Sequence, residues 1–516
     1  NTANTRSEWC NNATIKTDYE IVELVPNTEK TNYVSFPGNQ FCGDGYCRDT
    51  MLVNGTFPGP PIRGNWGDWF EITVINKLGN CNGTAIHWHG VRQLHTVWED
   101  GVPGVTQCPI APGQSQTYRW RATQYGTSWY HSHFSLQYSD GVAGPIIIDG
   151  PTSKNYNIDN GPLVLADWYH DDSFSLYYQE VMATPSARFI NTAPSVLING
   201  QGNFTDKAST YRTNINPSQH NDNVTVYKYR IINMSTLTQF SFWIDGHDFW
   251  VVATDFVPIA PIKRQFLNVA NGQRYDILIE AKTKEHLEEN HPNFWIKMQI
   301  PTSMAFSNSF EVDRRPGTQN LKEVFAGDHG GRETESIEQT QPYLWDFGSS
   351  HTDSQHPNGS YVSFMIDWGN ATLGLAADGI SPDTWNPRFV PTVLDTVDKW
   401  TVFAIAVNWT AEPNNRVTLG LPVATRAHPI HLHGHDFVIL AQSSDPFIYG
   451  HSYELDLVNP TRRDVVIVPA NGFVIIAFKT DNPGTWLMHC HIAWHSSAGL
   501  VLQWVERPSE IPGLMD

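Results

Sequence analysis

The chain has 516 residues, a formal net charge of −19, 38 glycines, 33 prolines and six cysteines. This length exceeds what one hydrophobic core fills, so about three domains are expected. The acidic balance and the lack of a basic cluster exclude nucleic acid and anionic membrane surfaces as partners, because Lys and Arg recognise both. No run of about eighteen apolar residues occurs, so no membrane span is predicted.

Short β-rich runs separated by turns rich in Gly and Pro predict an all-β protein. In chain order, such runs lie at 70–75, 144–149, 162–167, 195–200 and 400–407.

Three units are predicted along the chain. Residues 1–150 carry the first histidine pairs, residues 151–330 contain no cysteine and no His-x-His pair, and residues 331–516 carry the remaining pairs. The stretch 311–360, rich in charge, Gly and Ser, is expected to connect the second unit to the third. Without a cysteine or a His-x-His pair, the second unit is expected to hold no metal and to form part of a substrate wall.

Four segments rich in histidine carry the chemistry. They are His87-Trp-His89, His131-Ser-His133, the run 428–435, and His489-Cys490-His491. A lone His-x-His pair is more often a hydrogen-bonded structural feature than a metal site, but four pairs with one cysteine favour metal. On an extended strand successive side chains point to opposite faces, so His489 and His491 face one way and Cys490 the other. One strand can therefore serve two sites.

The same parity divides the remaining histidines. His431 and His433 share a face of their strand that His428 does not. We predict one site from His428, Cys490 and His495, because a thiolate with two imidazoles is typical of blue copper. The other histidines predict an imidazole-only cluster between the first and third units, of the kind that activates oxygen: His87, His89, His131, His133, His431, His433, His489 and His491.

With these segments in this order, the sequence resembles the multicopper oxidases, and among them the secreted laccases of filamentous (ascomycete) fungi, over essentially its whole length. The resemblance implies three consecutive cupredoxin-like Greek-key β-barrel domains and four copper ions. It implies type 1 copper on the predicted thiolate site, type 2 copper on His87 and His431, and a type 3 pair on the other six histidines. It also implies one-electron oxidation of phenols or aminophenols coupled to reduction of O2 to water.

The resemblance implies further roles near copper. Leu500 stands on the axial side of type 1 copper, where many relatives have methionine, and a site without that ligand is expected to have a high potential. Asp100 matches an aspartate that helps to deliver protons, although its sequence is equally typical of a turn. Electrons are expected to enter at His495 and to pass through Cys490, whereas His435 is expected to be a hydrogen-bonded loop residue.

The family pattern implies a substrate pocket formed by Ala193, Pro194, Leu237, Trp494 and His495. Relatives that oxidise phenols often place an acid where Leu237 stands, and its carboxylate takes the phenolic proton. Leucine offers no base, so weaker phenol oxidation is expected unless another group substitutes.

Other features predict a secreted glycoprotein, and the chain is separately expected to be a monomer. The first residue is asparagine, and nine sequons occur, at Asn12, Asn54, Asn82, Asn203, Asn223, Asn233, Asn358, Asn370 and Asn408. Secretion favours disulfides among Cys10, Cys42, Cys47, Cys81 and Cys108, whose odd number leaves one thiol over.

Several other functions are alternatives. A ferroxidase would need carboxylates beside His495 to hold Fe(II), and the sequence has no convincing set. An ascorbate oxidase or a bilirubin-type oxidase differs in its donor, and Leu500 argues against the members that carry methionine. A blue-copper electron carrier would need only the thiolate site and would leave eight histidines without a role.

Overall fold

The computed structural model describes residues 6, 28–182, 192–205, 210–218, 224–289, 293–300, 343–346, 364–407, 409–410, 427–448 and 450–515. These residues are mostly β, which confirms the predicted class. The α-helices described are short: α1 (Ser173–Met182), α2 (Lys284–Glu289), α4 (Thr372–Ala377), α5 (Ala493–Ser497) and α6 (Ile511–Met515). Among these residues, no helix has the length and apolar character needed to cross a membrane.

The N-terminal region contains two four-stranded sheets. One has the order β2 (Arg48–Val53), β1 (Thr28–Phe41), β4 (Trp69–Asn76), β6 (Ser115–Arg121), and the other β3 (Ile62–Asn65), β8 (Ala143–Asp149), β7 (Gly126–Ser132), β5 (Ile86–His89). Every second residue of β4 is buried, as expected for a strand with one face on a core. Phe70, Trp120 and Ile146 belong to that core, which both sheets share.

The middle region pairs a six-stranded sheet with a three-stranded one. The larger has the order β10 (Ser195–Ile198), β9 (Ile158–Trp168), β11 (Val226–Asn233), β16 (Arg274–Glu280), β13 (Phe249–Thr254), β14 (Val257–Arg264). The smaller has the order β15 (Phe266–Val269), β12 (Phe240–Ile244), β17 (Ile296–Gln299). Apolar residues of both sheets, including Leu163 and Phe242, form one core.

The C-terminal region contains two five-stranded sheets and a two-stranded one. The first has the order β18 (Tyr343–Asp346), β20 (Trp400–Ala406), β27 (Phe473–Lys479), β23 (Phe437–Ser443), β25 (Arg462–Arg463). The second has the order β19 (Pro391–Leu394), β29 (Val501–Glu506), β28 (Gly484–Cys490), β22 (His428–Leu432), β26 (Val465–Val468), and β21 (Trp409–Thr410) pairs with β24 (Phe447–Ile448).

The prediction that residues 311–360 only connect the second unit to the third is wrong in one part. Residues 343–346 form β18, which pairs with β20, because their apolar and aromatic side chains suit a sheet. The rest of that stretch lies outside the described residues.

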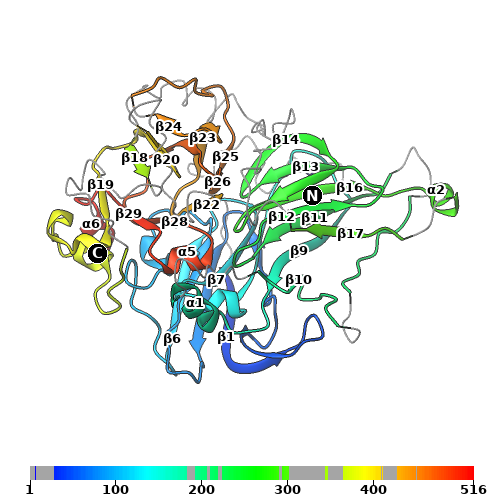
Figure 1. Ribbon diagram of the computed structural model, residues 1–516, viewed down its shortest axis with the longest axis horizontal. Helices are drawn as coiled ribbons and strands as arrows, with labels where there is room; N and C mark the ends of the chain where they lie inside the picture. The colour runs from blue at the N-terminus through cyan, green and yellow to red at the C-terminus, as the bar shows by residue number, and fades with distance from the viewer. Residues whose placement is uncertain are drawn as a thin grey trace.

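The three regions meet at a common interface. One continuous core includes Trp129 from the first region, Ile232 from the second, and Phe403, Ile430 and Trp494 from the third. In Figure 1 the cyan strand β7, the green strands and the orange to red β22 and β28 converge near the centre of the molecule. Strands from distant parts of the sequence therefore present side chains to one place.

Candidate metal centre

Two strand pairs build the centre. Antiparallel pairing of β5 with β7 places His87 opposite His131, and pairing of β22 with β28 places His431 opposite His489. All residues of these four strands are buried. Register and alternation therefore direct histidines from both ends of the chain toward one interior space.

Imidazoles gather there in three groups whose ligand atoms lie within 4.8 Å of one another. The groups are His89, His131 and His491; His133, His433 and His489; and His87, His89 and His431. Nδ1 of His89 lies 3.3 Å from Nε2 of His491. Each group combines residues of the first and third regions, so none exists until these regions are packed together.

The thiol forms a separate group with two other histidines. Sγ of Cys490 lies 3.5 Å from Nδ1 of His428 and 3.6 Å from Nδ1 of His495, and the two Nδ1 atoms are 3.2 Å apart. Cys490 ends β28, between His489 and His491 of the imidazole groups. One short segment therefore joins the two kinds of site.

The donor set fits copper. Backbone carbonyls accept from Nδ1 of His87, His131, His431 and His489 at 2.8–3.0 Å, which leaves each Nε2 with its lone pair. Three of these Nε2 atoms, in His87, His131 and His431, are buried without a hydrogen-bond partner in the part of the chain that the structure describes. Soft thiolate with imidazole, and imidazole alone, are both ligand sets that copper prefers.

Burial keeps seven of the imidazoles neutral and the thiol protonated in the metal-free protein. It lowers the pKa of His89, His131, His133, His431, His433 and His491 well below the usual value, and that of His489 to about 4. It raises the pKa of Cys490 well above its usual range. A metal binding as a thiolate complex must therefore displace the proton of Cys490.

Asp100 touches two of the imidazoles. Its Oδ2 accepts from Nδ1 of His433 at 2.8 Å, and its Oδ1 lies 3.2 Å from Nδ1 of His87. The carboxylate is fully buried. The next residue, Gly101, has φ +77°, and a Cβ there would overlap the carbonyl of Ile86. The segment is thus a turn, and that turn carries a carboxylate into the centre.

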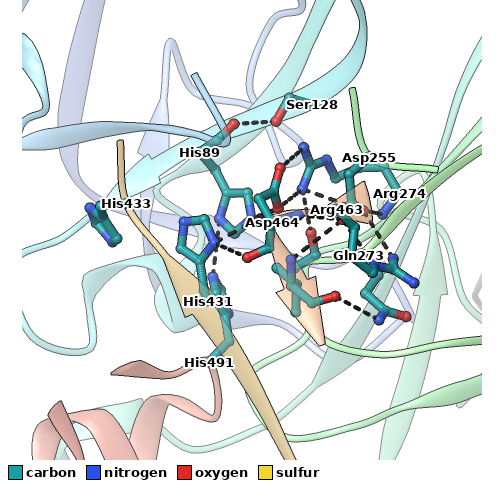
Figure 2. Close-up of polar contacts among 12 residues, drawn as sticks. His89, Ser128, Asp255, Gln273, Arg274, His431, His433, Arg463, Asp464 and His491 are labelled. Atoms are coloured by element: carbon teal, nitrogen blue, oxygen red, sulfur yellow. Dashed lines mark hydrogen bonds and ion pairs between the residues drawn. The ribbon is translucent and has the colours of Figure 1, made fainter. Parts of the chain in front are cut away.

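Asp464 and Arg274 also belong to this centre, and sequence reasoning missed both. The carbonyl of Asp464 accepts from Nδ1 of His431 at 2.8 Å, and its Oδ1 lies 3.4 Å from Nε2 of His89. Arg274 donates to both carboxylate oxygens at 2.5 and 2.6 Å (Figure 2). Burial raises the pKa of Asp464 to about 6, although Arg274 opposes this. An Arg-Arg-Asp run carries no local signal of a metal site.

Of the residues expected to line a substrate pocket, two pack on the core that also contains Cys490. Ala193 and Leu237 are half-buried and pack on the core that includes Trp494 and Leu500, whereas Pro194 is exposed. His495 is half-buried. The carbonyl of Leu500 accepts from the amide of Cys490 at 3.1 Å, which ties this leucine to the thiol segment.

Sequence reasoning also missed Asp167, which shapes the loop that carries Leu237. Its buried carboxylate accepts from the amides of Thr236, Leu237 and Thr238 at 2.7–2.9 Å. The carbonyl of Thr236 accepts from the amide of Ala493, the first residue of α5. The loop and the helix that carries His495 are therefore held together.

His435 lies outside the metal-binding groups that the described residues form. Its Nε2 is 2.9 Å from Oε2 of Glu506. Burial alone would lower the pKa of His435, but the Glu506 carboxylate raises it above the usual value. This histidine pairs with a carboxylate inside the third region.

The predicted disulfides and glycosylation sites lie partly within the described residues. Cys42 and Cys47 form a disulfide, Cys81 and Cys108 are exposed free thiols, and Cys10 lies outside the described residues. Asn54, Asn203 and Asn370 are exposed and Asn82 is half-buried, while Asn12, Asn223, Asn358 and Asn408 also lie outside the described part.

The expected sequon at Asn233 requires correction. Its side chain is fully buried, and its Nδ2 donates to the carbonyls of Thr238 and Val269 at 3.0 and 2.8 Å. A glycan on Nδ2 would replace one of its two hydrogens and so remove one of these bonds, and the buried amide offers a glycan no path to solvent.

We expect the metal-free protein to lose stability as the pH falls below about 6.5, the usual histidine pKa. The unfolded chain takes up protons there, whereas burial keeps the seven cluster histidines with a lowered pKa neutral, among them His489, whose pKa is lowered to about 4. The free energy of unfolding therefore falls below about pH 6.5, by up to about 1.4 kcal/mol per pH unit for each proton that only the unfolded chain takes up. For His489 this loss levels off near pH 4. Chemical denaturation at several pH values measures this slope. His489→Gln should reduce it by about one proton, and a free energy of unfolding that does not change with pH would contradict the prediction.

Comparison with known proteins identifies the family. Models of the multicopper oxidase family match residues 39–153, 159–320 and 391–510. The chain is 37% identical to a dihydrogeodin oxidase of Aspergillus terreus, with 100% of this chain and 89% of that protein covered. It is also 37% identical to Laccase-2 of Botryotinia fuckeliana, with 99% and 87% covered. The solved structure of the Botrytis aclada laccase is 35% identical, covers 99% of this chain and 93% of its own, and has a TM-score of 0.78. The chain belongs to the multicopper oxidase family and is a copper-dependent oxidoreductase.

Proposed function

We propose that the chain is a secreted, monomeric laccase-type oxidase that uses phenolic or aminophenolic donors and O2. The observation that carries this proposal is the single segment 489–491, in which Cys490 meets His428 and His495 while its neighbours enter the imidazole groups. When bound, copper supplies one-electron oxidation of the donor at the thiolate site and four-electron reduction of O2 to water at the histidine cluster. An electron carrier would require only the first of these sites.

We assign the ligands as follows. Type 1 copper would be held by His428, Cys490 and His495, and type 2 copper by His87 and His431. The type 3 pair would be held by His89, His131 and His491 on one ion and by His133, His433 and His489 on the other, and the ligand atoms within each of these two groups lie within 4.8 Å of one another. Leu500 offers no ligand atom, and type 1 copper held by its three residues without a further ligand would have a high potential.

The chain's own residues prepare the donor side. The half-buried edge of His495 is the point of electron entry, and Leu237, Ala193, Pro194 and Trp494 form the wall beside it. The loop of Leu237 supplies shape but no base. At the oxygen side, Asp100 holds His87 and His433 and is placed to pass protons inward.

Oxygen uptake by the copper-loaded protein tests the proposal. The panel contains a methoxyphenol, an aminophenol, a non-phenolic one-electron dye, ascorbate and Fe(II), compared as kcat/KM. Preference for the phenol or the aminophenol supports a laccase-type enzyme. Preference for Fe(II) or ascorbate would assign the chain to one of the other oxidases, and no oxygen uptake with any donor would favour an electron carrier.

A base placed at Leu237 should increase phenol oxidation. In Leu237→Glu we expect kcat/KM for the methoxyphenol to rise roughly tenfold, a small part of the roughly 10²–10⁴-fold that a positioned base contributes. The non-phenolic dye releases no proton and should be unaffected. Leu237→Gln is the matched control, since it has a similar shape and no base. An equal rise in both variants, or for the dye as well, would show that shape rather than proton transfer limits the reaction.

A further inference from the structure

We infer that Arg274, a residue of the middle region, is a positioning residue of the histidine cluster: its guanidinium fixes the Asp464 carboxylate, and this carboxylate orients His89. The inference rests on the proposed function, because it concerns how this chain holds copper at that cluster. It assigns the middle region, which contributes none of the proposed ligands, a direct part in the metal site.

Arg274 is held in a fixed position between the three regions. Its side chain is fully buried and joins all three regions. Nε donates to the carbonyl of Thr127 on β7 at 3.2 Å, and Nη1 donates to the carbonyl of Gly272 at 3.1 Å. Both terminal nitrogens donate to Asp464 of the third region (Figure 2). A buried guanidinium with these partners cannot rotate without breaking several charge-assisted bonds.

Asp464 lies against two histidines of the cluster, His431 and His89. Its carbonyl holds Nδ1 of His431, and its carboxylate faces Nε2 of His89, while Nδ1 of His89 faces His491. A ligating histidine usually directs its other nitrogen to a carboxylate or carbonyl, which sets the tautomer and the ring orientation. A second carboxylate, Asp255, secures the backbone, since it accepts from the amides of Asp464 and Arg274 at 3.1 and 3.0 Å.

Two glycines beside the Arg274–Asp464 ion pair leave space that a side chain would fill. Gly90 follows His89 with φ +75°, and a Cβ there would overlap both Oδ2 of Asp464 and Nη2 of Arg274. Gly272 has φ +81°, and its Cβ would lie 3.0 Å from both His491 and His89. The ion pair and the turn of the middle region therefore lie directly against two imidazoles of one group.

The test is selective loss of cluster copper in Arg274→Lys. Lysine keeps the charge but cannot bind both carboxylate oxygens in a fork. We expect a competing chelator to remove cluster copper roughly 10–100-fold more readily than from the wild type. The blue absorption of the thiolate site should remain. Copper per chain, the blue absorption and the electron paramagnetic resonance of the cluster are measured after loading with a copper salt.

Arg230→Lys is the matched control. Arg230 is also a buried arginine of the middle region, and it binds Asp159 through Nε and Nη2 at 3.1 and 2.7 Å. If both variants lose blue and cluster copper to the same extent, Arg274 serves only domain packing and the inference fails. It also fails if Arg274→Lys retains cluster copper as tightly as the wild type.

A second pair of variants tests the inference even if Arg274→Lys does not fold. Gly90→Ala keeps both charges but displaces the pair, and we expect the same selective loss. Gly113→Ala is its control, because Gly113 has a similar φ of +78° and nothing within 4 Å of its Cβ. Equal behaviour of the two alanine variants would overturn the inference. A wild-type chain that binds copper only at the blue site would contradict the proposed function instead.

Discussion

Replacing Cys490 with serine is expected to abolish the blue absorption and to reduce donor oxidation by more than about 100-fold. Substitution of a residue that only supports a metal ligand already lowers metal affinity or activity roughly 10–100-fold, and Cys490 is the proposed thiolate ligand itself. Its Sγ lies 3.5–3.6 Å from the two Nδ1 atoms of its group, where a serine hydroxyl offers a harder and weaker donor. The segment that links the thiol site to the imidazole groups would lose the sulfur through which electrons are expected to pass.

The measurement is copper content, blue absorption and oxygen uptake with a non-phenolic dye. Cys490→Ser should retain the copper of the histidine cluster, because His489 on β28 and His491 directly after it keep their positions. Cys108→Ser is the control, since Cys108 is an exposed free thiol. A Cys490→Ser protein that stays blue and oxidises the dye at the wild-type rate would refute the ligand assignment.

Changing Asp100 to asparagine is expected to slow the oxygen half of the reaction roughly 10–100-fold while donor oxidation continues. The carboxylate accepts from Nδ1 of His433 and lies 3.2 Å from Nδ1 of His87. Asparagine keeps the shape, but its NH2 group cannot accept a proton from an imidazole N–H, and its amide cannot carry a proton inward. The effect should therefore fall on the imidazole groups and leave the thiol site unaffected.

Rapid mixing separates the two halves. Bleaching of the blue absorption by a donor without oxygen should be unchanged in Asp100→Asn, and recovery of the colour on adding O2 should be slow. Asp140→Asn provides the control: Asp140 is also a buried aspartate of the first region, bound to Arg48 at 2.9 Å. Slow bleaching with normal recovery, or the same defect in the control, would exclude the assigned role.

Much of the centre could be predicted from local patterns because strand geometry is local. Alternation along β28 separates Cys490 from His489, and alternation along β22 separates His428 from His431, while His491 follows directly after the end of β28. The chemistry of thiolate and imidazole then indicates copper without knowledge of the fold. Other features lacked such a pattern. The sequon at Asn233 is complete, yet only the packing of β11 shows that its side chain is buried.

The sequence by itself determined the fold class, the residue types proposed as ligands and their division between two kinds of group, since residue type and strand parity are properties of short segments. Only the tertiary structure decided which charged groups support those ligands. Arg274, Asp464 and Asp167 lie among ordinary strand and loop residues, and they acquire a role because distant segments bury them beside the centre. A buried charge must find a partner, and that partner is set by packing between regions rather than by spacing along the chain.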